Sequence, residues 1–296
     1  MSQEKGPTEP DRDTAPALVI LAAGRARRYG GCKPLAPVGP HGEAVIDLVA
    51  SDAVAAGFGT IVLVLGPSTG PAIRYHVEHT WPGDVDVRFA TQPSPLGTVH
   101  AVLSASDHVG TSSYGVGNAD DIYGQAACAQ LVSHLRAHPD ANALVGYRLS
   151  DAVVGTSPVT RGICRVADDG TLLGVDERRQ VTRTPEGGFV AGDGREPAEL
   201  PGDARVSMNL WGFTPAFHKT LQAAMDAAVD ASEESEVLLP EVVAESLATS
   251  TFTVLPAQGR CIGVTHPDDL ALVQAELNRQ VAAGERPAVL WASRRR

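Results

Sequence analysis

A loop rich in glycine and in cations follows the first apolar segment of the chain. It reads LAAGRARRYGGCK over residues 21–33 and continues directly from the apolar run Ala17 to Leu21. Small residues let a backbone approach a nucleotide closely, and their free N–H groups bind phosphate oxygens. Three arginines and Lys33 gather here in a chain whose net charge is -11, so we expect the loop to hold an anion. The simpler alternative is a solvated arginine face.

An acidic pair follows a second apolar run. The segment 118–121 (NADD) comes after Tyr114 to Val116, where a strand is expected to end. A hard cation such as Mg²⁺ takes carboxylate oxygens and commonly bridges a protein to phosphate. Asp120 is therefore a candidate metal ligand, with Asp121 as the alternative. The competing interpretation is that both aspartates cap the next helix.

The first loop lacks the GK[ST] step of a Walker loop and the GxGxxG of a dinucleotide fingerprint. It resembles instead the nucleotidyltransferases with an LAAG-x(3)-R-x-G-G-x-K-P-L loop, above all those that act on sugar 1-phosphates. In that family the loop wraps a nucleoside triphosphate, while an arginine and a lysine neutralise it. The resemblance makes Arg28 and Lys33 catalytic. It assigns nucleotide binding to the loop residues Leu21, Ala22, Ala23 and Gly24.

The resemblance also implies a Mg²⁺ cofactor. Asp120 aligns with the metal-binding aspartate of the family and so counts among the catalytic residues. A second ligand, often Asp or Asn, is usual near residue 265, where this chain has Thr265. The second ligand is therefore left open, and Asp268 and Asp269 are more simply interpreted as helix caps.

A segment with the pattern Q-x(4)-G-T-x-H-A spans residues 92–101. Glycine and threonine are ordinary at the start of a helix, which is the structural alternative. In the family that the loop resembles, such a segment reads the base, which makes Gln92, Gly97 and Thr98 nucleotide-binding residues. A glutamine amide that pairs with a pyrimidine edge slightly favours UTP or dTTP, although adenylyltransferases carry similar segments.

The second half of the chain carries a weaker likeness. Residues 175–178 (VDER) resemble the V-x-E-K segment that holds the sugar phosphate, so that Glu177 would accept from sugar hydroxyls and Arg178 would hold phosphate in place of the usual lysine. The alternative is a charged hairpin end. Gly162 and Asn209 match a glycine that lies against the sugar and an asparagine that faces it.

Apolar runs alternate with helical patterns in the first half, which predicts a mostly parallel sheet covered by helices on both faces. Among these elements we expect a helix over about Val45 to Ala56, a strand over Thr60 to Leu65 and a helix over Thr98 to Ser106. In the second half, Gly162 to Val166 and Thr171 to Val175 are expected to pair as a hairpin around the turn signal 168–170 (DDG). Ligands bind at the carboxyl ends of such strands, where both loops of interest lie. The resemblance implies a Rossmann-like, glycosyltransferase-A-like nucleotidyltransferase fold. We expect one domain over residues 16–284, with a nucleotide-binding half (16–150) and a sugar-phosphate-binding half (151–284). Residues 1–15 and 285–296 are expected to be tails, and residues 185–203 a loop or flap.

Composition narrows the classes of function. No apolar run approaches the roughly 18 residues of a membrane span, and four scattered cysteines favour reduced thiols in a cytoplasmic protein. The acidic net charge disfavours nucleic acid and anionic membranes as partners. The sequence is compatible with a homo-oligomer but carries no hexapeptide repeats.

These observations predict an enzyme that condenses an NTP with a sugar 1-phosphate to give a nucleotide sugar and pyrophosphate. One alternative is a cytidylyl- or guanylyltransferase with a non-sugar acceptor, such as a pterin or polyol phosphate. The other is a nucleotide-sugar sensor without catalysis.

Overall fold

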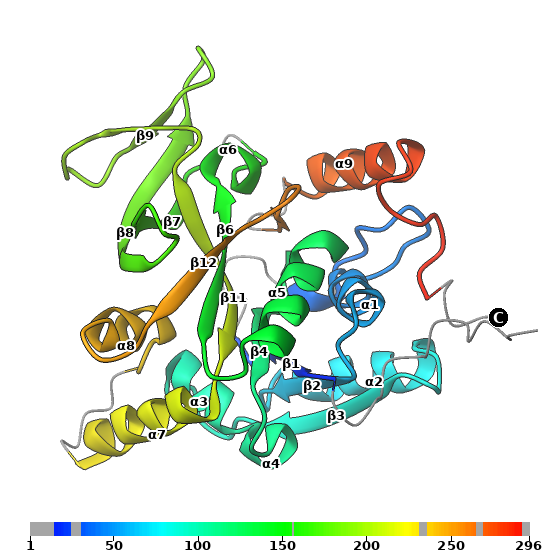
Figure 1. Ribbon diagram of the computed structural model, residues 1–296. Helices are drawn as coiled ribbons and strands as arrows, with labels where there is room; N and C mark the ends of the chain where they lie inside the picture. The colour runs from blue at the N-terminus through cyan, green and yellow to red at the C-terminus, as the bar shows by residue number, and fades with distance from the viewer. Residues whose placement is uncertain (1–14, 25–30, 156, 231–235, 265–268, 292–296) are drawn as a thin grey trace, which may run out of the picture.

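The computed structural model describes residues 15–24, 31–155, 157–230, 236–264 and 269–291. Four parallel strands form the first half of its large sheet, in the order β3-β2-β1-β4 (Figure 1). They are β1 (Ala17–Ala22), β2 (Thr60–Leu65), β3 (Asp86–Thr91) and β4 (Tyr114–Asn118). The interior strands read as continuous apolar runs because helices cover both of their faces. The carboxyl ends of β1 and β4 lie beside each other, since Leu21 is in register with Asn118.

The second half extends the same sheet with antiparallel strands. The strand β11 (Arg205–Phe213) pairs with β4, with β6 (Asn142–Arg148) and with β7 (Val159–Val166). The hairpin of β7 and β8 (Leu172–Arg183) continues into the short strands β9 (Phe189–Ala191) and β10 (Glu199–Leu200). The strand β12 (Phe252–Pro256) runs parallel to β6. One sheet therefore carries both halves of the expected site.

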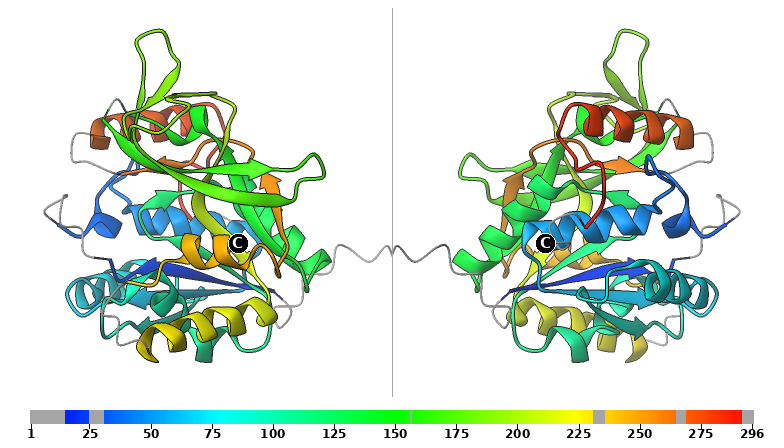
Figure 2. Two further views of the ribbon diagram at one scale, coloured as in Figure 1. Left: turned by 90° about the vertical axis from the view of Figure 1, so that its left-hand side faces the viewer. Right: turned by 90° about the vertical axis from the view of Figure 1, so that its right-hand side faces the viewer.

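Helices pack on the two faces of this sheet and enclose two apolar cores (Figure 2). One face carries α1 (Val45–Ala56), α2 (Gly70–Thr80), α5 (Gln125–Ala137) and α9 (Leu270–Ala282). The other carries α3 (Gly97–Leu103), α4 (Ser106–Val109), α7 (Pro215–Asp230) and α8 (Leu239–Ser246). The short helix α6 (Leu149–Ala152) follows β6. No helix in the described ranges is both long and apolar enough to cross a membrane.

The predicted fold class is confirmed, and most predicted elements agree with the structure to within a few residues. Three of the expected elements differ from the structure. The helix expected over residues 98–106 is divided into α3 and α4. The hairpin is longer than its turn signal indicated. The expected loop 185–203 contains β9 and β10, because Phe189, Ala191 and Leu200 are buried.

The segment after residue 284, expected to be a tail, lies against the domain as far as Trp291. The Arg286 guanidinium forms a buried, bidentate ion pair with Asp52 of α1, with N–O distances of 2.7 and 2.8 Å. The Trp291 ring packs on Trp81, with 5.4 Å between centroids. No local pattern predicts this docking, because the partners come from more than 200 residues earlier in the chain.

We predict that Arg286→Ala lowers the free energy of unfolding by about 3–5 kcal/mol, because it leaves the Asp52 carboxylate buried without its cation. Denaturant unfolding measures this. The matched control is Arg88→Ala, which breaks an ion pair with Asp86 whose side chains are both nearly half exposed, and which costs less than about 1 kcal/mol. Equal losses in the two variants would contradict the docking of this segment.

Candidate active site

Lys33 and Asp120 meet at the adjoining ends of β1 and β4. The Ala119 N–H donates to the Leu21 carbonyl at 3.3 Å, which joins the end of β1 to the turn after β4. The first loop returns through the short 3-10 helix Lys33–Leu35, where the Lys33 Nζ lies 3.7 Å from Asp120 Oδ2. Lys33 and Asp120 are far apart along the chain, and the parallel pairing of β1 with β4 brings them together.

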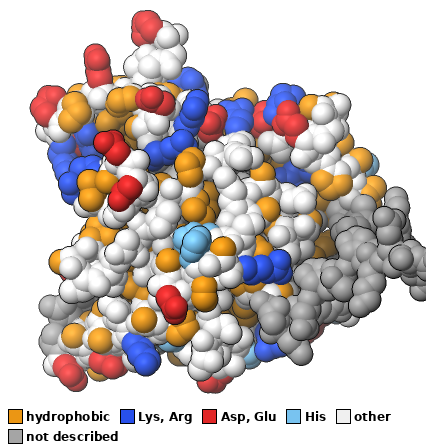
Figure 3. Space-filling view, in the orientation of Figure 1, with side chains coloured by type: hydrophobic (Ala, Val, Ile, Leu, Met, Phe, Trp, Pro, Cys, Tyr) orange, Lys and Arg blue, Asp and Glu red, His pale blue; other side chains and the backbone are white. Residues whose placement is uncertain are grey.

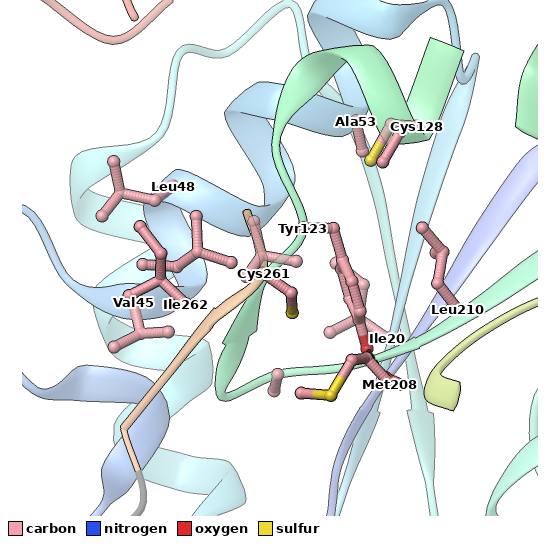
Figure 4. Close-up of a cluster of buried hydrophobic side chains, with 14 of the residues drawn as sticks. Ile20, Val45, Leu48, Ala53, Tyr123, Cys128, Met208, Leu210, Cys261 and Ile262 are labelled. Atoms are coloured by element: carbon pink, nitrogen blue, oxygen red, sulfur yellow. Dashed lines mark hydrogen bonds between the residues drawn. The ribbon is translucent and has the colours of Figure 1, made fainter. Parts of the chain in front are cut away.

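A buried tyrosine fixes the turn that carries the acidic pair. The Tyr123 hydroxyl accepts from the Asn118 N–H at 2.7 Å and donates to the Met208 carbonyl of β11 at 3.0 Å. Figure 4 shows the Tyr123 side chain among Ile20, Met208 and Cys261, with its hydroxyl toward Met208. The Asn118 side-chain amide donates to Asp121 Oδ2 at 2.9 Å. The turn is thereby tied to two strands, which holds the carboxylates in place.

The two carboxylates are placed where negative charge is costly. Burial raises the pKa of Asp120, and burial followed by the neighbouring Asp120 charge raises the pKa of Asp121 to about 6. Lys33 opposes both effects. Adjacent carboxylates with one nearby cation suit a hard divalent ion, which keeps several waters and takes its remaining ligands from phosphate. Asp120 and Asp121 would hold such an ion. No larger cluster of His, Cys, Asp or Glu occurs within the described ranges.

Two predicted residues, Arg28 and Thr265, lie outside the described residues. The segment before Thr265 is placed beside the acidic pair. The strand β13 (Ile262–Gly263) pairs with β5 (Asp121–Ile122), and the Val264 N–H donates to the Asp120 carbonyl at 3.3 Å.

A cavity of about 1110 Å³ opens next to the acidic pair. Five predicted site residues line it: Lys33, Asp120, Gly162, Glu177 and Asn209. The β7–β8 hairpin and β11 form the wall across from the carboxyl ends of β1 and β4. The cavity thus joins the predicted triphosphate side to the predicted sugar side.

On the sugar side, Gly162 of β7 and Glu177 of β8 are register partners. Asn209 lies at an irregularity of β11, with a φ of 59°. Its N–H donates to Ser207 Oγ at 3.2 Å, and its side-chain oxygen accepts from Trp211 Nε1 at 3.3 Å. These contacts hold Asn209 at the cavity wall.

Gln92, Gly97 and Thr98 make contacts within the protein and are not among the residues that line the cavity. The Gln92 Nε2 donates to the Gly97 carbonyl at 3.0 Å, and Thr98 Oγ1 accepts from the Leu239 N–H at 2.8 Å. Gly97 has a φ of 95°, and a Cβ there would clash with the Val237 backbone. This segment therefore anchors the start of α8, which itself borders the cavity.

The structure places Arg178 away from the cavity. Its side chain is 6% exposed and pairs with Asp193 at 2.8 Å. Sequence reasoning instead missed Arg161, Arg179 and Arg195, which do line the cavity. Successive side chains of a strand point to opposite faces, so the sequence indicates that Arg178 and Arg179 point in opposite directions. It does not show which of the two faces meets the cavity.

Comparisons with known proteins identify the family of this chain. Residues 18–239 match the family model described as the MobA-like NTP transferase domain. A glucose-1-phosphate thymidylyltransferase of Mycolicibacterium smegmatis is 22% identical over 171 residues, which are 56% of each chain. The chain thus spans little more than half the length of this curated relative.

Solved structures share the fold at low sequence identity. A UDP-glucose pyrophosphorylase complexed with UDP-glucose has a TM-score of 0.63 at 13% identity, over 90% of this chain and 99% of that one. A UTP-bound UGPase from Acinetobacter baumannii has a TM-score of 0.60 at 20% identity, over 92% and 95%.

We predict that Asp121→Asn raises the melting temperature of the metal-free protein when the pH is above 6, and leaves it unchanged at about pH 4. Folding raises the pKa of Asp121 from 3.8 to about 6, so the neutral carboxyl stabilises the folded protein below pH 3.8 and this stabilisation is lost as pH rises through about 6. The side chain of Asn stays neutral at every pH, so the variant does not lose this stability. Thermal unfolding at both pH values measures it, with exposed Asp86→Asn as the control. No gain from Asp121→Asn at high pH would contradict the cost of this charge.

Proposed function

The chain belongs to the MobA-like NTP transferase family, and from this premise we propose that it joins an NTP to a sugar 1-phosphate and releases pyrophosphate. The observation that carries the proposal is the convergence of Lys33 and the acidic pair at one end of a cavity whose other wall is polar. An oxygen of the acceptor phosphate attacks the α-phosphorus of the NTP, and the bond from that phosphorus to pyrophosphate breaks. A phosphate dianion is already nucleophilic at neutral pH, so the reaction needs no general base.

The residues contribute position and charge. Lys33, with Arg28, would neutralise the triphosphate, and Asp120 with Asp121 or Thr265 would hold Mg²⁺. A bound Mg²⁺ supplies charge neutralisation and orientation of the triphosphate oxygens. The strand end Leu21 to Gly24 lies beside this turn, where its backbone would follow the nucleotide. The site thus depends on a fixed arrangement of charges rather than on proton transfer.

A polyhydroxyl acceptor fits the cavity wall. Glu177, Asn209 and Gly162 line it, and no aromatic ring is among the described lining residues. A planar pterin would lack a stacking partner there, whereas sugar hydroxyls would find carboxylate and amide groups. This contrast favours a sugar over a heterocyclic acceptor.

We further propose UTP or dTTP as the donor. The relatives above include a thymidylyltransferase and a UTP-bound enzyme. Four free thiols support the expected cytoplasmic location.

Lys33→Ala should reduce pyrophosphate release at least about a hundredfold while the protein stays folded, because the triphosphate loses a positioned cation. Coupled pyrophosphate detection measures the rate, and circular dichroism checks folding. The matched control is Lys219→Ala, an exposed lysine of α7 that should leave the rate unchanged. A near-normal rate of pyrophosphate release by the Lys33→Ala variant would contradict this mechanism.

A screen that crosses the four NTPs with sugar 1-phosphates and with non-sugar phosphates tests the acceptor. We expect pyrophosphate release with UTP or dTTP and a sugar 1-phosphate. Release only with a non-sugar phosphate would replace the acceptor, and binding without release would indicate a sensor.

A further inference from the structure

The arginine predicted to hold the acceptor phosphate is buried, and its guanidinium group forms hydrogen bonds within the protein. Arg178 donates from Nε and Nη2 to the two Asp193 oxygens at 2.8 and 3.0 Å. It also donates to the carbonyls of Pro197 and Arg195 at 2.9 and 2.7 Å. With both side chains of the ion pair less than a tenth exposed, Arg178 has no free face to offer a ligand.

The same ion pair fixes the backbone on either side of it. Asp193 accepts from the Arg179 N–H and from the Arg195 N–H, both at 3.1 Å. The carboxylate therefore joins β8 to the segment 193–197 through three hydrogen bonds, two of them from Arg178, and accepts a fourth from within that segment. We call Arg178 and Asp193 the clasp. A charge-assisted network of this kind holds its neighbours in one geometry.

Two arginines that adjoin the clasp converge at the cavity. Arg179 Nε lies 3.0 Å from Glu177 Oε1, and Arg195 Nη1 donates to the Glu177 carbonyl at 3.0 Å. Both guanidinium groups thus reach the same residue, and all three residues line the cavity. Figure 3 shows basic and acidic side chains gathered over the lobe formed by β7, β8 and β9.

We propose that Arg179 and Arg195 bind the phosphate of the acceptor and that the clasp positions them. This inference rests on the proposed function. The Arg179–Glu177 pair is mostly exposed and therefore weak, so a phosphate dianion can displace the carboxylate. Two guanidinium forks suit phosphate oxygens better than a single ammonium does.

Kinetics of pyrophosphate release test the two binding residues. Arg179→Gln and Arg195→Gln should each raise the acceptor KM about tenfold or more and leave the NTP KM within about twofold. Arg165→Gln is the matched control, because this arginine lies on the same hairpin, is 63% exposed and pairs with Asp176. Unchanged acceptor KM values in both binding-site variants would overturn the proposal.

Arg178→Lys tests the clasp. A lysine cannot reproduce the bidentate pair, so the acceptor KM should rise while the NTP KM stays constant. If Arg178 bound phosphate directly, lysine would keep that contact and the acceptor KM would stay normal, which would overturn the positioning role.

Inorganic phosphate separates this inference from the proposed function. Phosphate should raise the melting temperature of the wild type and of Arg165→Gln, but not of Arg179→Gln or Arg195→Gln. This pattern in a protein that releases no pyrophosphate would refute the proposed function and retain the anion site. An equal rise in all four proteins would overturn the anion site.

Discussion

The candidate site depends on keeping two adjacent carboxylates at a partly buried strand end. Burial and mutual repulsion disfavour the charges of Asp120 and Asp121, as their raised pKa values show. The fold tolerates them because Lys33 lies opposite and because Tyr123 ties the turn to β11. A bound divalent cation would relieve the repulsion that remains. The stability lost at this turn would thus be the counterpart of an affinity for a metal ion.

The two halves of the chain serve this site in different ways. Parallel strands form the proposed triphosphate side, because their carboxyl ends meet at one edge. Antiparallel strands form the proposed acceptor side, where Gly162 and Glu177 face each other across β7 and β8. The strand β11 joins them, since it pairs with β4 and with β7. Movement of either half would therefore change the distance between the reacting groups.

Local patterns predicted most of the fold and the edge of the sheet at which Lys33 and Asp120 meet. The helix Val45–Ala56 and the strand Thr60–Leu65 have the predicted bounds, because apolar periodicity and a following glycine determine both. The role of Arg178 could not be read in this way. Whether its side chain points to the cavity depends on register with β7 and on Asp193, which a local motif does not contain. Gln92 and Thr98 show the same difficulty, because polar groups can bind a ligand or the protein's own backbone.

The fate of the NTP α-phosphate shows whether the protein transfers a nucleotidyl group to a sugar 1-phosphate. An NTP with a radioactive α-phosphate is incubated with the protein, Mg²⁺ and a sugar 1-phosphate, and the products are separated by anion exchange. We expect the label to enter a phosphatase-resistant nucleotide sugar and unlabelled pyrophosphate to be released. Label found only in free nucleoside mono- or diphosphate, or left in the NTP with every acceptor, would contradict it.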